Sequence, residues 1–166
     1  MANLSWEALA KDSEWIPSNK DKYLKKRGRW VLELPNEYRK NIRTAGFQAT
    51  PARIYGTRGY FSKKINNRVV RMWDFTEEQY QALIKLCIGI NKLLPRIKLQ
   101  VPFDKNSGRH PLNRLKNYSN FSGILGHAHV QKGDNGLECK YDPGSAFNWS
   151  RLKKAFDASS RDSASC

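Results

Sequence analysis

Two residues that can bind a metal ion, His127 and Asp142, lie close together near the C-terminal end of the chain. His127 follows an apolar run at 123–126, and Asp142 begins an Asp-Pro-Gly turn. Imidazole nitrogens and carboxylate oxygens both bind zinc, and a catalytic zinc takes three protein ligands with a fourth position open. Lys140 lies two residues before Asp142, so in an extended segment its ammonium group projects to the same side, where it could stabilise an oxyanion. These residues predict half of a zinc site; the alternative is a packed histidine beside an ordinary turn.

The motifs around these residues resemble a known enzyme family. GILGHAHV at 123–130 and KYDPGSAFNW at 140–149, followed by a short basic helix, are similar to the C-terminal end of the zinc-dependent type 2 N-acetylmuramoyl-L-alanine amidases, whose fold is shared with peptidoglycan recognition proteins. In that family the histidine of the Gly-His pair and the aspartate bind zinc, and the lysine assists catalysis. The resemblance therefore implies that His127 and Asp142 are zinc ligands, that Lys140 is catalytic, and that the substrate is peptidoglycan.

The resemblance becomes weaker upstream. DFTEEQY at 74–80 and the apolar stretch after it are similar to the family's long helix, which precedes the Gly-His strand. RGRWVLELPNEY at 27–38 is similar to the central strand, where the family has a glutamate that helps to activate water. This implies that Glu33 is a catalytic general base; the alternative is an edge-strand glutamate that faces solvent.

The family's first zinc histidine has no counterpart in this chain, whose histidines are His110, His127 and His129. The residues before Glu33 are also too few for the strand, helix and hairpin that the family places there. We expect His110 and His129 to be a loop histidine or a hydrogen-bond partner rather than a third ligand. The chain thus resembles the C-terminal part of such an enzyme, and we expect a partner chain to supply the N-terminal half and to cover the open edge of the sheet.

The chain is strongly basic. Its 166 residues include 30 Lys and Arg against 15 Asp and Glu, which gives a formal net charge of +15, while 39% hydrophobic residues are typical of a folded domain. Residues 36–72 combine nine Lys and Arg with one acid and several aromatic residues, a mixture suited to RNA, and residues 92–116 are also basic. A solvated basic face is the alternative. The candidate nucleic-acid contacts are Arg39, Lys40, Arg43, Arg53, Arg58, Lys63, Lys64 and Arg68.

Sequence periodicity predicts the elements that position these residues. Strands are expected at 30–34, at 68–72 and, as a buried strand, at 121–130. Thr76 is a natural N-cap with Gln79 at the capping-box position, so a long helix should begin there and stop before Pro95. A second helix is expected at 149–158. The fold class is then α/β: a partial amidase-like fold with a central mixed sheet, a long helix covering it and long basic loops.

The same pattern divides the chain into a polar N-terminal arm at 1–29, an incomplete amidase-like domain at 30–158 with an insertion-like loop at 96–120, and a tail at 159–166. The three cysteines, Cys87, Cys139 and Cys166, show no disulfide spacing, which favours a reducing intracellular compartment such as the cytoplasm or an organelle matrix. The N-terminus does not resemble a signal peptide and no apolar run is long enough to cross a bilayer, so we expect no membrane insertion.

Three functions fit these observations. The first is a zinc-dependent amidase domain that is incomplete and inactive alone and is completed by a partner. The second is a non-catalytic, basic structural subunit of a ribonucleoprotein, such as an organellar ribosome, with a vestigial site. The third is a module that binds peptidoglycan without cleaving it.

Overall fold

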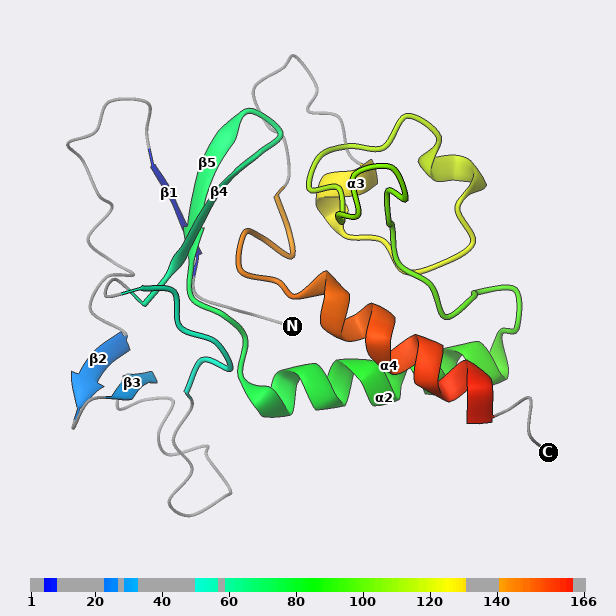
Figure 1. The fold of residues 1–166 in the computed structure, drawn as a ribbon, viewed down its shortest axis with the longest axis horizontal. Helices are drawn as coiled ribbons and strands as arrows, with labels where there is room; N and C mark the ends of the chain where they lie inside the picture. Colours follow the sequence, from blue (N-terminus) through cyan, green and yellow to red (C-terminus); the bar gives the residue numbers. More distant parts are fainter. Residues whose placement is uncertain are drawn as a thin grey trace.

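The computed structural model describes residues 5–8, 23–26, 29–32, 50–56, 59–130 and 141–162, the first three segments as backbone alone. Strands β1 (Ser5–Ala8), β5 (Arg68–Met72) and β4 (Phe61–Ile65) form an antiparallel sheet in that order, as Figure 1 shows. Strands β2 (Tyr23–Lys26) and β3 (Arg29–Leu32) form a separate antiparallel pair. The protein is therefore of mixed α and β structure, although every strand pairing that the structure describes is antiparallel rather than mixed.

Strands β4 and β5 form a hairpin that the sequence patterns did not fully predict. Strand β5 matches the strand expected at 68–72, whereas β4 was expected to be loop. Asn66 and Asn67 form the turn with positive φ angles of 45° and 69°, a conformation that asparagine tolerates better than most residues. The alternation of β4 is hidden, because the three residues at 62–64 are all exposed and only the two ends of the strand, Phe61 and Ile65, are partly or fully buried.

The long helix α2 (Glu77–Leu93) begins and ends where the sequence predicts. The Thr76 hydroxyl accepts a hydrogen bond from Gln79 N, and the Gln79 side chain accepts one from Thr76 N, which completes a capping box. Glu77 and Glu78 in the first turn complement the helix dipole. Leu94 follows the last turn, and Pro95 prevents continuation.

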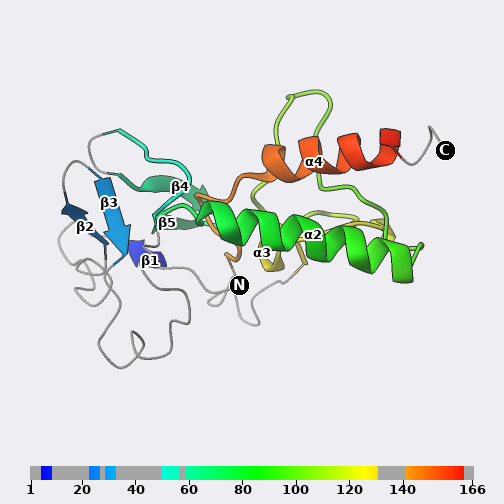
Figure 2. The same ribbon diagram turned by 90° about the horizontal axis from the view of Figure 1, so that it is seen from below.

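Helix α2 packs against α4 (Trp149–Asp162), and the two lie side by side in Figure 2. The two helices contribute Tyr80, Cys87, Leu152 and Phe156 to one buried hydrophobic cluster. The strands gather beyond the N-terminal end of α2. The expectation that α2 covers a sheet is thus not met among the described residues, because its apolar face is taken by another helix.

The prediction of a buried strand at 121–130 is wrong. Residues 121–126 are irregular, and His127–Val130 form the one-turn helix α3. Only two backbone hydrogen bonds join this segment to residues 98–100, from Lys98 N to Ser122 O and from Ile124 N to Gln100 O, so no ladder forms. An apolar run reads the same way in a buried strand and in a buried loop, and periodicity cannot separate the two.

The remaining segments bear on the predicted boundaries. The stretch 96–120 is irregular apart from a 3₁₀ turn, η2 (Tyr118–Asn120), and a bridge between Asp104 and Arg109. Helix α4 continues to Asp162, so the boundary predicted at 159 falls inside a helix. Strand β1 lies in the predicted arm and pairs with β5. Of the helices in the described part of the chain, none has the length and apolar character that a membrane span requires.

Candidate functional site

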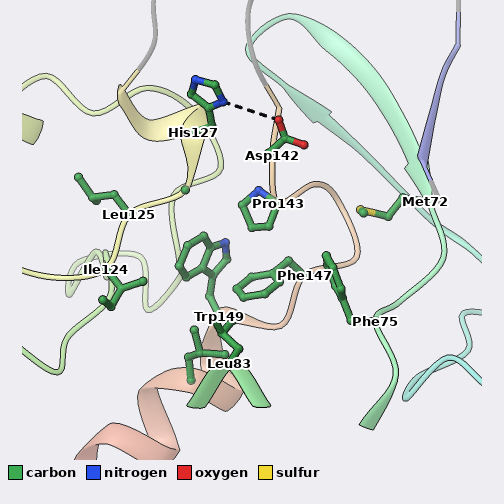
Figure 3. A pocket seen from close by; sticks show the side chains of 12 residues that line it. Met72, Phe75, Leu83, Ile124, Leu125, His127, Asp142, Pro143, Phe147 and Trp149 are labelled. Atoms are coloured by element: carbon green, nitrogen blue, oxygen red, sulfur yellow. Dashed lines mark ion pairs between the residues drawn. The ribbon is translucent and has the colours of Figure 1, made fainter. Parts of the chain in front are cut away.

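His127 and Asp142 face each other in the folded chain. The ten residues at 131–140, which lie between them in sequence, are not described. His127 Nδ1 lies 3.8 Å from Asp142 Oδ2, and Figure 3 shows the two side chains directed toward one another at the rim of a cavity. Their side chains are 47% and 67% exposed, so both are accessible from solvent. A nitrogen and a carboxylate oxygen thus converge on one accessible point.

The backbone fixes this meeting of the two segments. Ala128 N donates a hydrogen bond to Asp142 O over 3.0 Å, which joins the residues next to the site directly. Gly126 permits the approach, because a Cβ there would lie 2.5 Å from Pro143 Cδ and 2.9 Å from Asp142 O. The glycine of the Gly-His pair is therefore required by the close contact of two backbones rather than by its own φ angle.

The tip of the β4–β5 hairpin supports helix α3 from the other side. Asn66 Nδ2 donates to Ala128 O over 2.9 Å, and Asn66 Oδ1 accepts from Arg114 N over 2.9 Å. Asn66 N in turn donates to Asn113 Oδ1. One turn residue thus joins the hairpin, the 113–114 loop and the helix that begins with His127.

The cavity beneath the pair has a volume of about 280 Å³ and apolar walls. His127 and Asp142 are the only ionisable side chains among its described lining residues. In Figure 3, Trp149 and Phe147 lie below Pro143, and Met72 and Phe75 lie to the right of it. The other lining residues are Leu83, Ile124, Leu125, Gly126, Pro143 and Leu152. The site is a polar pair at the mouth of an apolar hollow.

His129 is buried, and both of its ring nitrogens bond to the backbone rather than to Asp142. It is 1% exposed, its Nδ1 accepts from Gly126 N over 3.0 Å, and its Nε2 lies 2.9 Å from Pro111 O. This network assigns the neutral tautomer with the proton on Nε2. Burial lowers the pKa of His129 below its usual value, against the opposing effect of the Pro111 carbonyl. The ring of Trp149 lies 5.0 Å away, centroid to centroid.

The chain's own donors fit half of a zinc site. Ligand atoms on a tetrahedral zinc stand about 3.3 Å apart, so the 3.8 Å separation requires a side-chain shift of only a fraction of an ångström. The remaining histidine, His110, has its Nδ1 2.7 Å from Pro102 O and does not line the cavity beneath His127. Within residues 50–56, 59–130 and 141–162, no group of three or more His, Cys, Asp or Glu side chains converges.

The other candidate residues are distributed as follows. Glu33 and Lys140 lie outside the described residues, as do Arg39, Lys40, Arg43 and Arg58, and Arg68 is described as backbone only. Lys63 and Lys64 are exposed on β4. Arg53 is engaged within the protein, because its Nε donates to Asp74 Oδ2 over 2.6 Å and its Nη2 donates to Ala146 O.

Sequence reasoning missed the buried network around Asp74. This carboxylate is fully buried; besides Arg53, it accepts from Phe75 N over 2.9 Å and from the Tyr80 hydroxyl over 2.5 Å. The Tyr80 hydroxyl accepts in turn from Asn148 N at the start of α4. Burial, and then the charge of Asp74, raise the pKa of Tyr80. An acid inside the apolar run 72–75 was the available signal, because a buried carboxylate needs a partner.

No protein-family model matches this chain, and comparisons with curated proteins and with solved structures return no match either.

Proposed function

We propose that this protein is the C-terminal part of a zinc-dependent N-acetylmuramoyl-L-alanine amidase, with His127 and Asp142 as two of the three zinc ligands. The observation that carries the proposal is the 3.8 Å separation of His127 Nδ1 and Asp142 Oδ2 at the mouth of an apolar cavity. The two ligands come from separate motifs, GILGHAHV and KYDPGSAFNW, which lie near each other in sequence. Their convergence on one point supports a shared ligand rather than two unrelated surface residues.

The chain's residues have distinct roles in this proposal. Bound zinc supplies Lewis-acid chemistry, which polarises a carbonyl group and makes water nucleophilic at neutral pH. His127 and Asp142 hold the ion, and the apolar walls exclude water and receive the methyl groups of the lactyl and alanine units. From the sequence, Lys140 stabilises the oxyanion of the attacked amide and Glu33 accepts a proton from water.

The proposal includes a partner chain that supplies the third ligand. Both ring nitrogens of His129 are engaged, His110 does not line the cavity beneath His127, and the sequence has no histidine besides these three. Two ligands hold catalytic zinc weakly. The chain alone is therefore inactive, and activity belongs to its complex.

The proposal is tested on the complex isolated from the native source. We expect one zinc per pair of chains and release of peptides from purified peptidoglycan, with both lost in the His127→Ala chain and retained in His110→Ala. A complex that contains no second protein and no zinc, or one whose zinc survives His127→Ala, would contradict it.

A second function, a structural subunit of a ribonucleoprotein, is favoured by the unpaired positive charge. Lys63, Lys64 and Arg109 are exposed and have no carboxylate partner among the described residues. Recovery of the chain with ribosomal RNA and ribosomal proteins in the same purification would support this alternative and exclude the first.

A further inference from the structure

A second cavity, of about 460 Å³, lies between the β4–β5 hairpin, the 108–112 loop and the start of α4. It shares only Phe147 and Trp149 with the cavity beneath His127. In Figure 1 the orange segment that leads into α4 lies between the β4–β5 hairpin and α3. Among the described residues that line this second cavity, the ionisable ones are Arg53, Lys63, Arg109 and His110, and none is a carboxylate.

Lys63 is directed toward this cavity by the alternation of its strand. It shares a face of β4 with Phe61 and Ile65, both of which pack into the core, whereas Lys64 lies on the opposite face. Although Lys63 is exposed to solvent, the protein groups around its ammonium group partly desolvate it, and this effect, followed by the nearby charge of Arg53, lowers its pKa. Positive charges are thus held close together on the cavity wall.

The described residues do not balance these positive charges. Arg53 is matched by Asp74, but Lys63 and Arg109 have no carboxylate partner among the described residues. Asp104, the acid nearest in sequence to Arg109, is occupied by Ser107 and Asn106, and its carboxylate does not line the cavity. Two cationic side chains therefore remain at the cavity.

The start of α4 adds further donors. Trp149 and Ser150, the first two residues of this 14-residue helix, line the cavity, and its first turn contains no acid to offset the helix dipole. Asn148 Oδ1 already accepts from Arg151 N, so the amide group of Asn148 is left to act as a donor. Ser150, which lines the same wall, carries a hydroxyl group.

We propose that this cavity binds the dianionic phosphate group of a small molecule, either inorganic phosphate or a phosphomonoester. The two cations match the charge of a phosphate dianion, and the neutral donors at the start of α4 match its oxygens. A carboxylate carries only one charge and leaves half of this set unmatched. The site is separate from the zinc half-site and does not depend on it.

The test is a titration of the metal-free full chain with inorganic phosphate, followed by the backbone amide NMR signals at constant ionic strength. Chelation of metal keeps zinc from binding the phosphate. We expect saturable shifts at Trp149 and Ser150. Lys63→Gln and Arg109→Gln should each raise the Kd by about fivefold or more, whereas Lys64→Gln, the matched control on the opposite strand face, should change it by less than about twofold. Methyl phosphate in a parallel titration distinguishes the sources, since equal or tighter binding identifies a phosphomonoester and weaker binding identifies free phosphate.

Three results would overturn the proposal. The first is a shift that stays linear with phosphate concentration. The second is an equal effect of Lys63→Gln and Lys64→Gln, which would indicate general charge screening. The third is tighter binding of a single-stranded oligonucleotide without terminal phosphates than of methyl phosphate, which would identify a phosphodiester surface.

Discussion

At the scale of single residues, Gly126 decides whether the two candidate ligands can meet. Any side chain there would collide with the backbone of Asp142 and Pro143, which cannot move without displacing the ligand itself. We expect Gly126→Ala to lower the free energy of unfolding by about 1–3 kcal/mol, as overpacking does, and to weaken zinc binding although both ligands are retained. Denaturant unfolding and zinc titration measure the two effects.

Gly89→Ala on α2 is the matched control for this prediction. Nothing lies within 4 Å of a Cβ at that position, so the same substitution should leave stability unchanged or raise it by up to about 1 kcal/mol. A Gly126→Ala chain that unfolds and binds zinc like the wild type would show that the two segments are not held together as described.

His129 gives the protein a pH dependence of known sign. Because its pKa is lowered in the folded state, the unfolded chain binds more protons in the mildly acidic range. Stability is therefore fully present above the unfolded value, near pH 6.5, and is lost as the pH falls below it, by at most about 1.4 kcal/mol per pH unit. Protonation would also place a hydrogen on Nδ1, where Gly126 N already donates.

Urea unfolding between pH 7.5 and 5.5 measures this effect. The wild type should lose stability across the interval, and His129→Leu should be less stable at pH 7.5 but flatter in its response. His110→Gln should flatten the slope only slightly, because the charge of His110 is the smallest of the causes that act on the pKa of His129. An unchanged slope in His129→Leu would assign the effect to another group.

At the scale of elements, the Asp74 network joins the start of α2 to the start of α4 through Tyr80 and Asn148. In Asp74→Asn an amide group can face the Arg53 Nε donor, so a partly buried ion pair becomes a contact between two donors. We expect a loss of about 3 kcal/mol in the free energy of unfolding. Asp157→Asn, in an exposed pair with Lys153, should cost about 0.5 kcal/mol or less. Equal losses in the two variants would mean that the network does not stabilise the helix pair.

Elements with local signals could be predicted from the sequence, and those set by distant contacts could not. Thr76, Gln79 and Pro95 are enough to place α2, because capping and its interruption depend on neighbouring residues. Strand β4 was missed because three successive exposed residues at 62–64 conceal its inner face. The run 121–126 was misassigned because only the backbone at 98–100 and 142–143 explains its glycines.

The candidate site, too, could be predicted where its signals are local and could not where they depend on distant contacts. Residue types and motif spacing were enough to choose His127 and Asp142, but not the walls of their cavity, because Met72 and Phe75 come from a segment far upstream. The contact of Arg53 with nucleic acid stays a prediction, and the sequence did not indicate that Arg53 also pairs with the buried Asp74.

At the scale of the whole molecule, the net charge of +15 must act on any polyanion that the chain meets. If RNA is the partner, the logarithm of the association constant should fall linearly with the logarithm of salt concentration, by a total of about 10³-fold or more between 50 and 200 mM for six or more phosphate contacts. Fluorescence anisotropy with a labelled RNA measures the slope. A flat response would exclude phosphate contacts as the function of this surface.

The most direct test of the central claim is a zinc titration of the isolated full chain by calorimetry, in a Cys139→Ser, Cys166→Ser background so that thiols do not compete. A half-site of His127 and Asp142 predicts weak binding of one zinc, with a Kd of about 10 μM or higher, that is abolished by His127→Ala and by Asp142→Asn. Zinc binding that survives both substitutions, or no binding in the parent chain, would contradict the assignment of these two residues as ligands.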